Sequence, residues 1–251
     1  MERPPIKGFL ETSFVDWPGR VAAVVFLPGC NFRCPYCHNH GLVLHPEEYQ
    51  SWSIENILQH LDAYRNWVDG VCVSGGEPTV HTGLPWLLER LRSAGWAVKL
   101  DTNGSLPGML AELLSAGSVD AVGLDVKSPL ESIPHRRNSG WSGDPGRVAE
   151  SVERLLDTGL PLYLRTTVHP RLLNLGELER LATDLGNRVR SRRGGSAEGV
   201  SFTVQRCRVE EVLDPDLAGA PGLDAEAFEV WQRRALAAYR QALQAPAPLR
   251  S

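Results

Sequence analysis

The chain has 251 residues, of which 42% are hydrophobic and 22% are charged, and its formal net charge is -4. These values are typical of a globular protein and exclude collagen-like, coiled-coil and wholly disordered chains. The weakly acidic balance also argues against a general nucleic-acid or membrane-surface binder.

The first residues of the chain lack the apolar stretch of a signal peptide. The strongest early apolar run, residues 21–27, is far shorter than the roughly 20 residues that a membrane-spanning helix needs. The sequence therefore predicts a cytoplasmic protein, in a compartment where thiols stay reduced. There the five cysteines indicate metal or redox chemistry rather than a disulfide framework.

Short apolar runs typical of strands alternate along the chain with amphipathic segments typical of helices. We expect strands at residues 21–27, 70–74, 97–101, 120–126, 161–168 and 200–205. We expect helices at residues 53–64, 84–94, 106–116, 145–157, 175–185 and 224–244. Ser53 is placed to cap the first helix, and Gly95, Gly117 and Gly159 stand where C-terminal caps belong.

This alternation predicts an α/β fold with a parallel sheet, which right-handed crossovers curl into a partial (β/α)6 barrel. Functional residues of such folds lie at the carboxyl ends of the strands. We expect one domain over residues 1–244, with a core at about 20–208, a C-terminal helix at about 224–244 and a frayed tail at 245–251. Residues 188–199, rich in arginine and glycine, are expected to form a flexible basic loop.

Three cysteines follow the first predicted strand in C-x3-C-x2-C spacing, at Cys30, Cys34 and Cys37. Three thiols on one loop can bind three irons of a cubane cluster and leave the fourth iron open, as catalytic metal sites keep one position free. The other two cysteines, Cys72 and Cys207, lie in or just after strands and are expected to be small buried apolar residues. We therefore expect a single cluster.

Other chemistries use parts of the same loop. Cys34-Pro-Tyr-Cys37 matches a glutaredoxin-type dithiol, although such a module has no use for Cys30. Cys34 to His38 spells the attachment motif of a c-type haem, which normally requires export. A structural zinc site could combine the three cysteines with His38 or His40.

Further motifs end the next three predicted strands. They are Ser74-Gly75-Gly76-Glu77-Pro78, Asp101-Thr102-Asn103-Gly104 and Asp125-Val126-Lys127. With the cysteine loop and the aromatic Tyr36 inside it, this series resembles the radical S-adenosylmethionine (SAM) superfamily over about residues 8–208.

The N-terminal motif narrows the resemblance. It comprises Thr12-Ser13-Phe14-Val15-Asp16-Trp17-Pro18-Gly19. Together with Gly29-Cys30-Asn31 and Cys37-His38-Asn39, it resembles the glycyl-radical-enzyme activases, and above all those that serve anaerobic ribonucleoside-triphosphate reductases. Trp17 departs from that pattern, which has Tyr at this position.

The resemblance implies a [4Fe-4S] cluster on Cys30, Cys34 and Cys37, and SAM as the second cofactor. It implies a monovalent cation at Asp101, Thr102 and Asp125. Glycines would let the backbone approach SAM closely, Glu77 would accept from its ammonium group, and Arg165 would clamp a carboxylate. The residues expected to bind SAM are Tyr36, His38, Gly75, Gly76, Glu77, Asn103, Asp125, Lys127, Arg165 and Gln205.

The implied function is that of an activase. A flavodoxin or ferredoxin reduces the cluster, SAM is cleaved to a 5′-deoxyadenosyl radical, and this radical takes a hydrogen atom from a glycine Cα of an anaerobic ribonucleotide reductase. Two alternatives stay open: a radical SAM enzyme for a small molecule, similar to 7-carboxy-7-deazaguanine synthase, and a zinc-binding interaction module.

Overall fold

The computed structural model describes residues 3–245 of the chain. Seven strands form one sheet in the order β1-β2-β3-β4-β5-β6-β7. The strands are β1 (Gly8–Ser13), β2 (Ala22–Leu27), β3 (Gly70–Gly75), β4 (Ala97–Thr102), β5 (Ala121–Asp125), β6 (Leu162–Val168) and β7 (Val200–Arg206). β1 is antiparallel to β2, and the following strands are parallel to one another. Since β1 and β7 are the two edges, the barrel is open, which confirms the predicted partial barrel.

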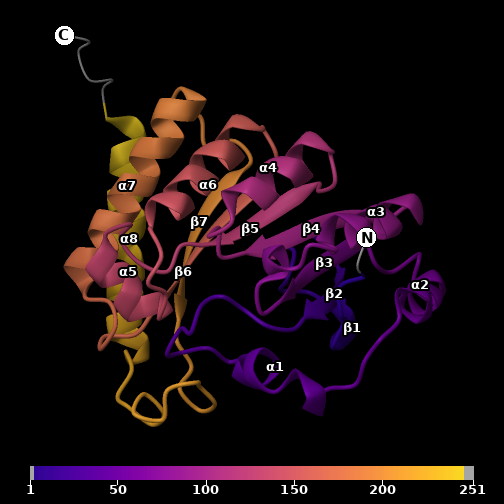
Figure 1. Ribbon diagram of the computed structural model, residues 1–251. Coiled ribbons are helices and arrows are strands. Elements are labelled where there is room, and N and C mark those ends of the chain that lie inside the picture. Colours follow the sequence, from indigo (N-terminus) through magenta and orange to yellow (C-terminus); the bar gives the residue numbers. More distant parts are fainter. Residues whose placement is uncertain (1–2, 246–251) are drawn as a thin grey trace.

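The longer helices cover the outer face of the sheet, and shorter helices lie in the loops between elements (Figure 1). They are α1 (His40–Leu44), α2 (Ile54–Ala63), α3 (Leu84–Ser93), α4 (Pro107–Ser115), α5 (Ser132–Ser139), α6 (Gly146–Asp157), α7 (Leu175–Arg193) and α8 (Ala225–Gln244). α7 packs between α6 and α8, and α8 also contacts β7. No helix of the described residues is long and apolar enough to cross a membrane.

The two faces of the sheet differ because successive side chains of a strand point to opposite sides. On β4, Val98 and Leu100 belong to the main apolar core beneath the helices. The alternating residues Lys99 and Asp101 are also buried, although both carry charge. The inner face of the barrel is therefore polar along part of its length, and this is where the candidate site lies.

The predicted strands and long helices are confirmed, with their ends shifted by a few residues. The Ser53 side chain caps α2 by accepting a hydrogen bond from the amide of Asn56 at 3.1 Å. Gly95, Gly117 and Gly159 have positive φ after α3, α4 and α6, as expected for C-terminal caps.

Some elements differ from the prediction. β1, α1 and α5 were not predicted, and α7 extends to Arg193. The expected flexible loop at 188–199 is therefore wrong over its first half, because Arg188 and Arg192 each bind Glu153 of α6 at 2.7 Å. The predicted frayed tail lies outside the described residues from residue 246 onward.

Candidate active site

A cavity of about 930 Å³ lies within the barrel, at the carboxyl ends of the parallel strands. Every residue that the sequence assigned to the cluster or to SAM lines this cavity: Cys30, Cys34, Tyr36, Cys37, His38, Gly75, Gly76, Glu77, Asn103, Asp125, Lys127, Arg165 and Gln205. Asp16 of the N-terminal motif also lines it. The volume lies in the range of pockets that enclose small molecules, about 300–1,000 Å³.

The three cysteines occupy the loop that follows β2. Their three Sγ atoms do not all lie within 4.8 Å of one another, so at least one pair of sulfurs is farther apart than that. Among the described residues, the one group of three potential ligands that is this close is His45, Glu47 and Glu48, at the surface. A tetrahedral zinc ion with Zn–S bonds of about 2.3 Å needs sulfurs about 3.8 Å apart. A cubane cluster binds each thiolate to a different iron and so holds the sulfurs farther apart. The donor set fits a cluster better than one zinc ion.

The environment of the thiols also bears on metal binding. Burial raises the pKa of Cys30 to about 12 and the pKa of Cys34 to about 11, and it raises the pKa of Cys37 as well. Lys127 opposes this effect at all three thiols. Since the thiolate is the form that binds metal, deprotonation of these cysteines must be coupled to the binding of a positively charged group.

Side-chain amides fasten the cysteine loop to the neighbouring strand ends. Asn31 donates to Ser105 Oγ at 2.6 Å, and Asn103 donates to Asn31 Oδ1 at 3.0 Å. Asn39 donates to the carbonyl oxygen of Gly75 at 2.9 Å. Neither asparagine was assigned a role from the sequence, although Asn31 directly follows Cys30 and Asn39 lies two residues after Cys37.

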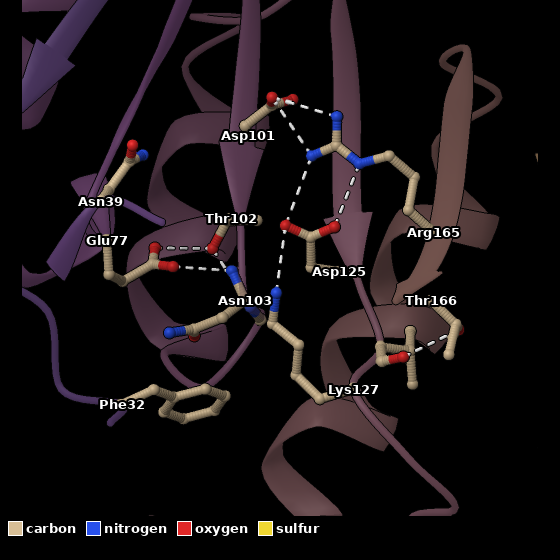
Figure 2. A network of polar contacts seen from close by, with 12 residues as sticks. Phe32, Asn39, Glu77, Asp101, Thr102, Asn103, Asp125, Lys127, Arg165 and Thr166 are labelled. Atoms are coloured by element: carbon tan, nitrogen blue, oxygen red, sulfur yellow. Dashed lines mark hydrogen bonds and ion pairs between the residues drawn. The ribbon is translucent and has the colours of Figure 1, made fainter. Parts of the chain in front are cut away.

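Glu77 follows β3 and is fully buried between the ends of β3 and β4 (Figure 2). Its carboxylate accepts from the amide and hydroxyl of Thr79, from the hydroxyl of Thr102 at 2.7 Å and from the amide of Asn103 at 2.6 Å. These contacts make Glu77 a brace between two motif loops. The binding of an ammonium group by Glu77, expected from the sequence, stays a prediction.

Replacing Glu77 with glutamine is expected to lower the free energy of unfolding by about 1–3 kcal/mol, the cost of leaving a buried donor unsatisfied. Both carboxylate oxygens face N–H or O–H donors, so a glutamine NH2 group must oppose at least one of them. Urea denaturation of the metal-free protein measures the change. The matched control is Glu89→Gln on the surface of α3, where Glu89 accepts from the Ser93 hydroxyl. A loss no larger than that of the control would contradict the bracing role.

Charged side chains from β4, β5 and β6 line one wall of the cavity (Figure 2). This charged wall consists of Asp101, Asp125, Lys127 and Arg165. Arg165 lies between two carboxylates: it bonds Asp125 through Nε at 3.0 Å and Asp101 at 3.1 Å. Lys127 lies 3.4 Å from the other oxygen of Asp125. Burial alone would raise the pKa of Asp125, but Arg165 and Lys127 lower it to about 2, so Asp125 is ionised at neutral pH.

Tyr36 is one of the aromatic residues that line the cavity, together with Phe32 and Phe228. It is 6% exposed, and its hydroxyl has no hydrogen-bond partner among residues 3–245. Lys127 Nζ lies 5.8 Å from the centre of its ring. The aromatic ring is therefore the part of Tyr36 that a ligand in the cavity can contact, because the hydroxyl is buried.

Comparison with known proteins places the chain in one family. Residues 24–185 match the radical SAM superfamily. A Methanocaldococcus jannaschii protein that carries the name of a glycyl-radical enzyme activating enzyme is 29% identical over 180 residues, which cover 70% of this chain and 73% of that protein. A Halobacterium salinarum protein named as a GTP 3′,8-cyclase is 35% identical over 55% of the chain and 40% of its own length. The 7-carboxy-7-deazaguanine synthase of Aquifex aeolicus is 34% identical over 35% of the chain and 38% of its own length.

A solved structure shows the same fold. The crystal structure of Streptococcus suis SuiB bound to S-adenosylmethionine superposes with a TM-score of 0.61 and 16% identity. The match covers 88% of this chain but 49% of SuiB, so the chain spans about half of that protein.

Proposed function

The chain belongs to the radical SAM superfamily, and on that premise we propose that it is a glycyl-radical-enzyme activase. Its partner would be an anaerobic ribonucleotide reductase, and its electron donor a flavodoxin or ferredoxin. The proposal treats residues 1–244 as one domain acting in the cytoplasm.

The cysteine loop would hold the [4Fe-4S] cluster through Cys30, Cys34 and Cys37, which leaves one iron without a protein ligand. When bound, the cluster and SAM supply the one-electron cleavage of SAM that leads to hydrogen abstraction. The chain's own residues hold the loop in place, because Asn31 and Asn39 tie it to the ends of β4 and β3.

The remaining lining would bind and orient SAM. Gly75 and Gly76 allow a ligand to approach the backbone closely, since neither has a side chain. Lys127 and Arg165 offer positive charge to a carboxylate, and Asp125 offers negative charge to an ammonium group. Tyr36, with His38 and Gln205 on the same lining, would face the adenosine part.

The observation that carries the activase proposal is the position of Asp16. It belongs to the N-terminal motif of the activase resemblance, and it lines the same cavity as the three cysteines. The preceding Phe14 and Val15 are 78% and 83% exposed, which leaves apolar side chains at this segment for contact with a protein. The M. jannaschii relative, matched over most of its length, supports the same choice.

A second candidate is a radical SAM enzyme for a small molecule. The relatives named as a GTP 3′,8-cyclase and as a 7-carboxy-7-deazaguanine synthase favour it, because the first name gives a purine nucleotide as substrate and the second a deazapurine as product. Both matches cover a minor part of those proteins, which weakens this support.

Product formation without a partner separates the two candidates. An activase alone with dithionite and SAM is expected to form 5′-deoxyadenosine only slowly, because no hydrogen donor occupies the cavity. Addition of an anaerobic ribonucleotide reductase should accelerate this and transfer the radical to the reductase. Anaerobic chromatography of 5′-deoxyadenosine, with and without the reductase, gives the answer. Rapid, multiple-turnover conversion of a purine or pterin without any protein partner would contradict the activase proposal and favour the second candidate.

A further inference from the structure

A buried lysine at the inner end of the charged wall has no role in the proposed function. Lys99 is one of three lysines in the chain, and its side chain is fully buried on β4. Its ammonium forms an ion pair with Asp101 and lies 3.7 Å from Cys72 Sγ. Burying an ammonium costs free energy unless it is paired, so Lys99 and Asp101 must be considered together.

Gly123 on β5 provides the space for this pair. It stands opposite Asp101 in the parallel register of β4 and β5. A Cβ at Gly123 would overlap Asp101 Oδ1, and it would lie 3.0 Å from Lys99 Nζ and 3.2 Å from Arg165 Nη2. Any larger residue would therefore displace one of the three charged groups.

The charges alternate from the interior to the cavity. Asp101 lies between Lys99 and Arg165, and Asp125 lies between Arg165 and Lys127. Side-chain exposure is 0% at Lys99, 8% at Asp101, 18% at Arg165, 28% at Asp125 and 14% at Lys127. Each carboxylate thus has a side-chain cation on both sides.

This arrangement does not fit the monovalent cation expected from the sequence at Asp101, Thr102 and Asp125. Oδ1 of Asp101 binds Lys99, and Oδ2 binds Arg165. The hydroxyl of Thr102 donates to Glu77 instead of facing the two carboxylates. An alkali ion takes oxygen ligands, and here the chain's own cations already hold those oxygens.

We propose that Lys99 is a positioning residue that replaces a bound alkali cation, so that the SAM site needs no such ion. Lys99 holds Asp101 against Arg165, and Arg165 in turn holds Asp125 beside Lys127 at the cavity wall. The inference rests on the proposed function in one respect, that the cavity binds SAM. Its test therefore has to separate the absence of SAM binding from a requirement for an alkali ion.

The first measurement uses the cluster-containing wild-type protein. SAM affinity is determined by anaerobic equilibrium dialysis in potassium chloride and in tetramethylammonium chloride at equal ionic strength. The two dissociation constants are expected to agree within about twofold, or about 0.4 kcal/mol. Binding that is lost or strongly weakened without potassium would overturn the inference while leaving the SAM site intact. Absence of binding in both salts would overturn the SAM site, and the inference with it.

The second measurement removes the ammonium. Lys99→Met keeps an unbranched side chain but leaves Asp101 with one cation. SAM binding in tetramethylammonium chloride is expected to weaken by about tenfold or more, about 1.4 kcal/mol. Potassium or ammonium, each close in size to the removed ammonium group, should restore it. Lys7→Met is the control, since the Lys7 ammonium donates to the Tyr49 carbonyl oxygen and to Ser51 Oγ at the surface, away from the cavity.

A purely structural role would weaken binding equally in every salt, and no role would leave it unchanged; either result overturns the inference. If Lys99→Met does not fold, the salt comparison on the wild-type protein decides alone.

Discussion

Alanine at Cys30, Cys34 or Cys37 is expected to abolish cluster binding, whereas Cys72→Ala and Cys207→Ala should retain about four irons per chain. Three thiols on the loop after β2 are the complete set of protein ligands in this account. Cys72 is fully buried beside Lys99 and does not line the cavity. Iron content and visible absorbance after anaerobic reconstitution measure the effect.

Cys207 is the cysteine most able to act as a fourth ligand, because it lines the same cavity as the three proposed ligands. The Cys207→Ala variant therefore tests whether the cluster has three or four cysteine ligands. Cys207 is 6% exposed, as expected for a small buried residue, and its thiol points toward the carbonyl oxygen of Arg208 at 3.2 Å. If Cys207→Ala lost as much iron as Cys34→Ala, the cluster would have four cysteine ligands. No iron would then be open to SAM, and the proposed chemistry would fail.

Gly76→Ala is expected to lower the free energy of unfolding by about 2–3 kcal/mol, as overpacking of a filled interior does, and to prevent cluster assembly. The end of β3 lies directly on the start of the cysteine loop: the amide of Gly76 donates to Leu27 at 2.8 Å, and the amide of Glu77 donates to Gly29 at 2.9 Å. A Cβ at Gly76 would overlap the carbonyl oxygen of Gly29. The backbone of one loop must therefore move away from the other.

The control is Gly108→Ala in α4, where a Cβ meets no atom within 4 Å. Gly108 is the second residue of α4, so this change is expected to alter the free energy of unfolding by no more than about 0.5 kcal/mol. Urea denaturation of the metal-free proteins and iron content after reconstitution measure both variants. Equal stability and equal iron in the two variants would show that the loops do not need their close approach.

The barrel could be predicted because its strands are apolar runs of the right length between amphipathic helices. β1 was missed because residues 8–13 begin at a glycine and mix polar with apolar residues at an edge of the sheet. The end of α7 was misread because its arginines have the composition of a solvated loop. Their partner Glu153 lies on another helix, so only the packing of α6 on α7 identifies the pairs.

In the site, too, some features could be predicted from the sequence and others depend on the packing of the chain. Motifs at the ends of successive strands could be placed together because parallel strands end at one side of a barrel. Lys99 and Gly123 gave no such signal, since each lies within a strand and gains its role from the residue opposite it in the register. The resemblance of its motif led to the expectation that Glu77 binds the ammonium group of SAM. Its hydrogen bonds with Thr102 and Asn103 could not be predicted, because these residues are distant in sequence and meet Glu77 only in the folded chain.

The central claim is that the hydrogen atom comes from a glycine of a partner protein. The direct measurement is electron paramagnetic resonance of the reduced protein mixed anaerobically with SAM and an anaerobic ribonucleotide reductase. The account predicts a doublet from the glycine α-hydrogen, which collapses to a singlet when the reductase carries α-deuterated glycine and which stays with the reductase after the two proteins are separated. A reductase without any radical, alongside catalytic turnover of a low-molecular-weight substrate by this chain alone, would contradict it.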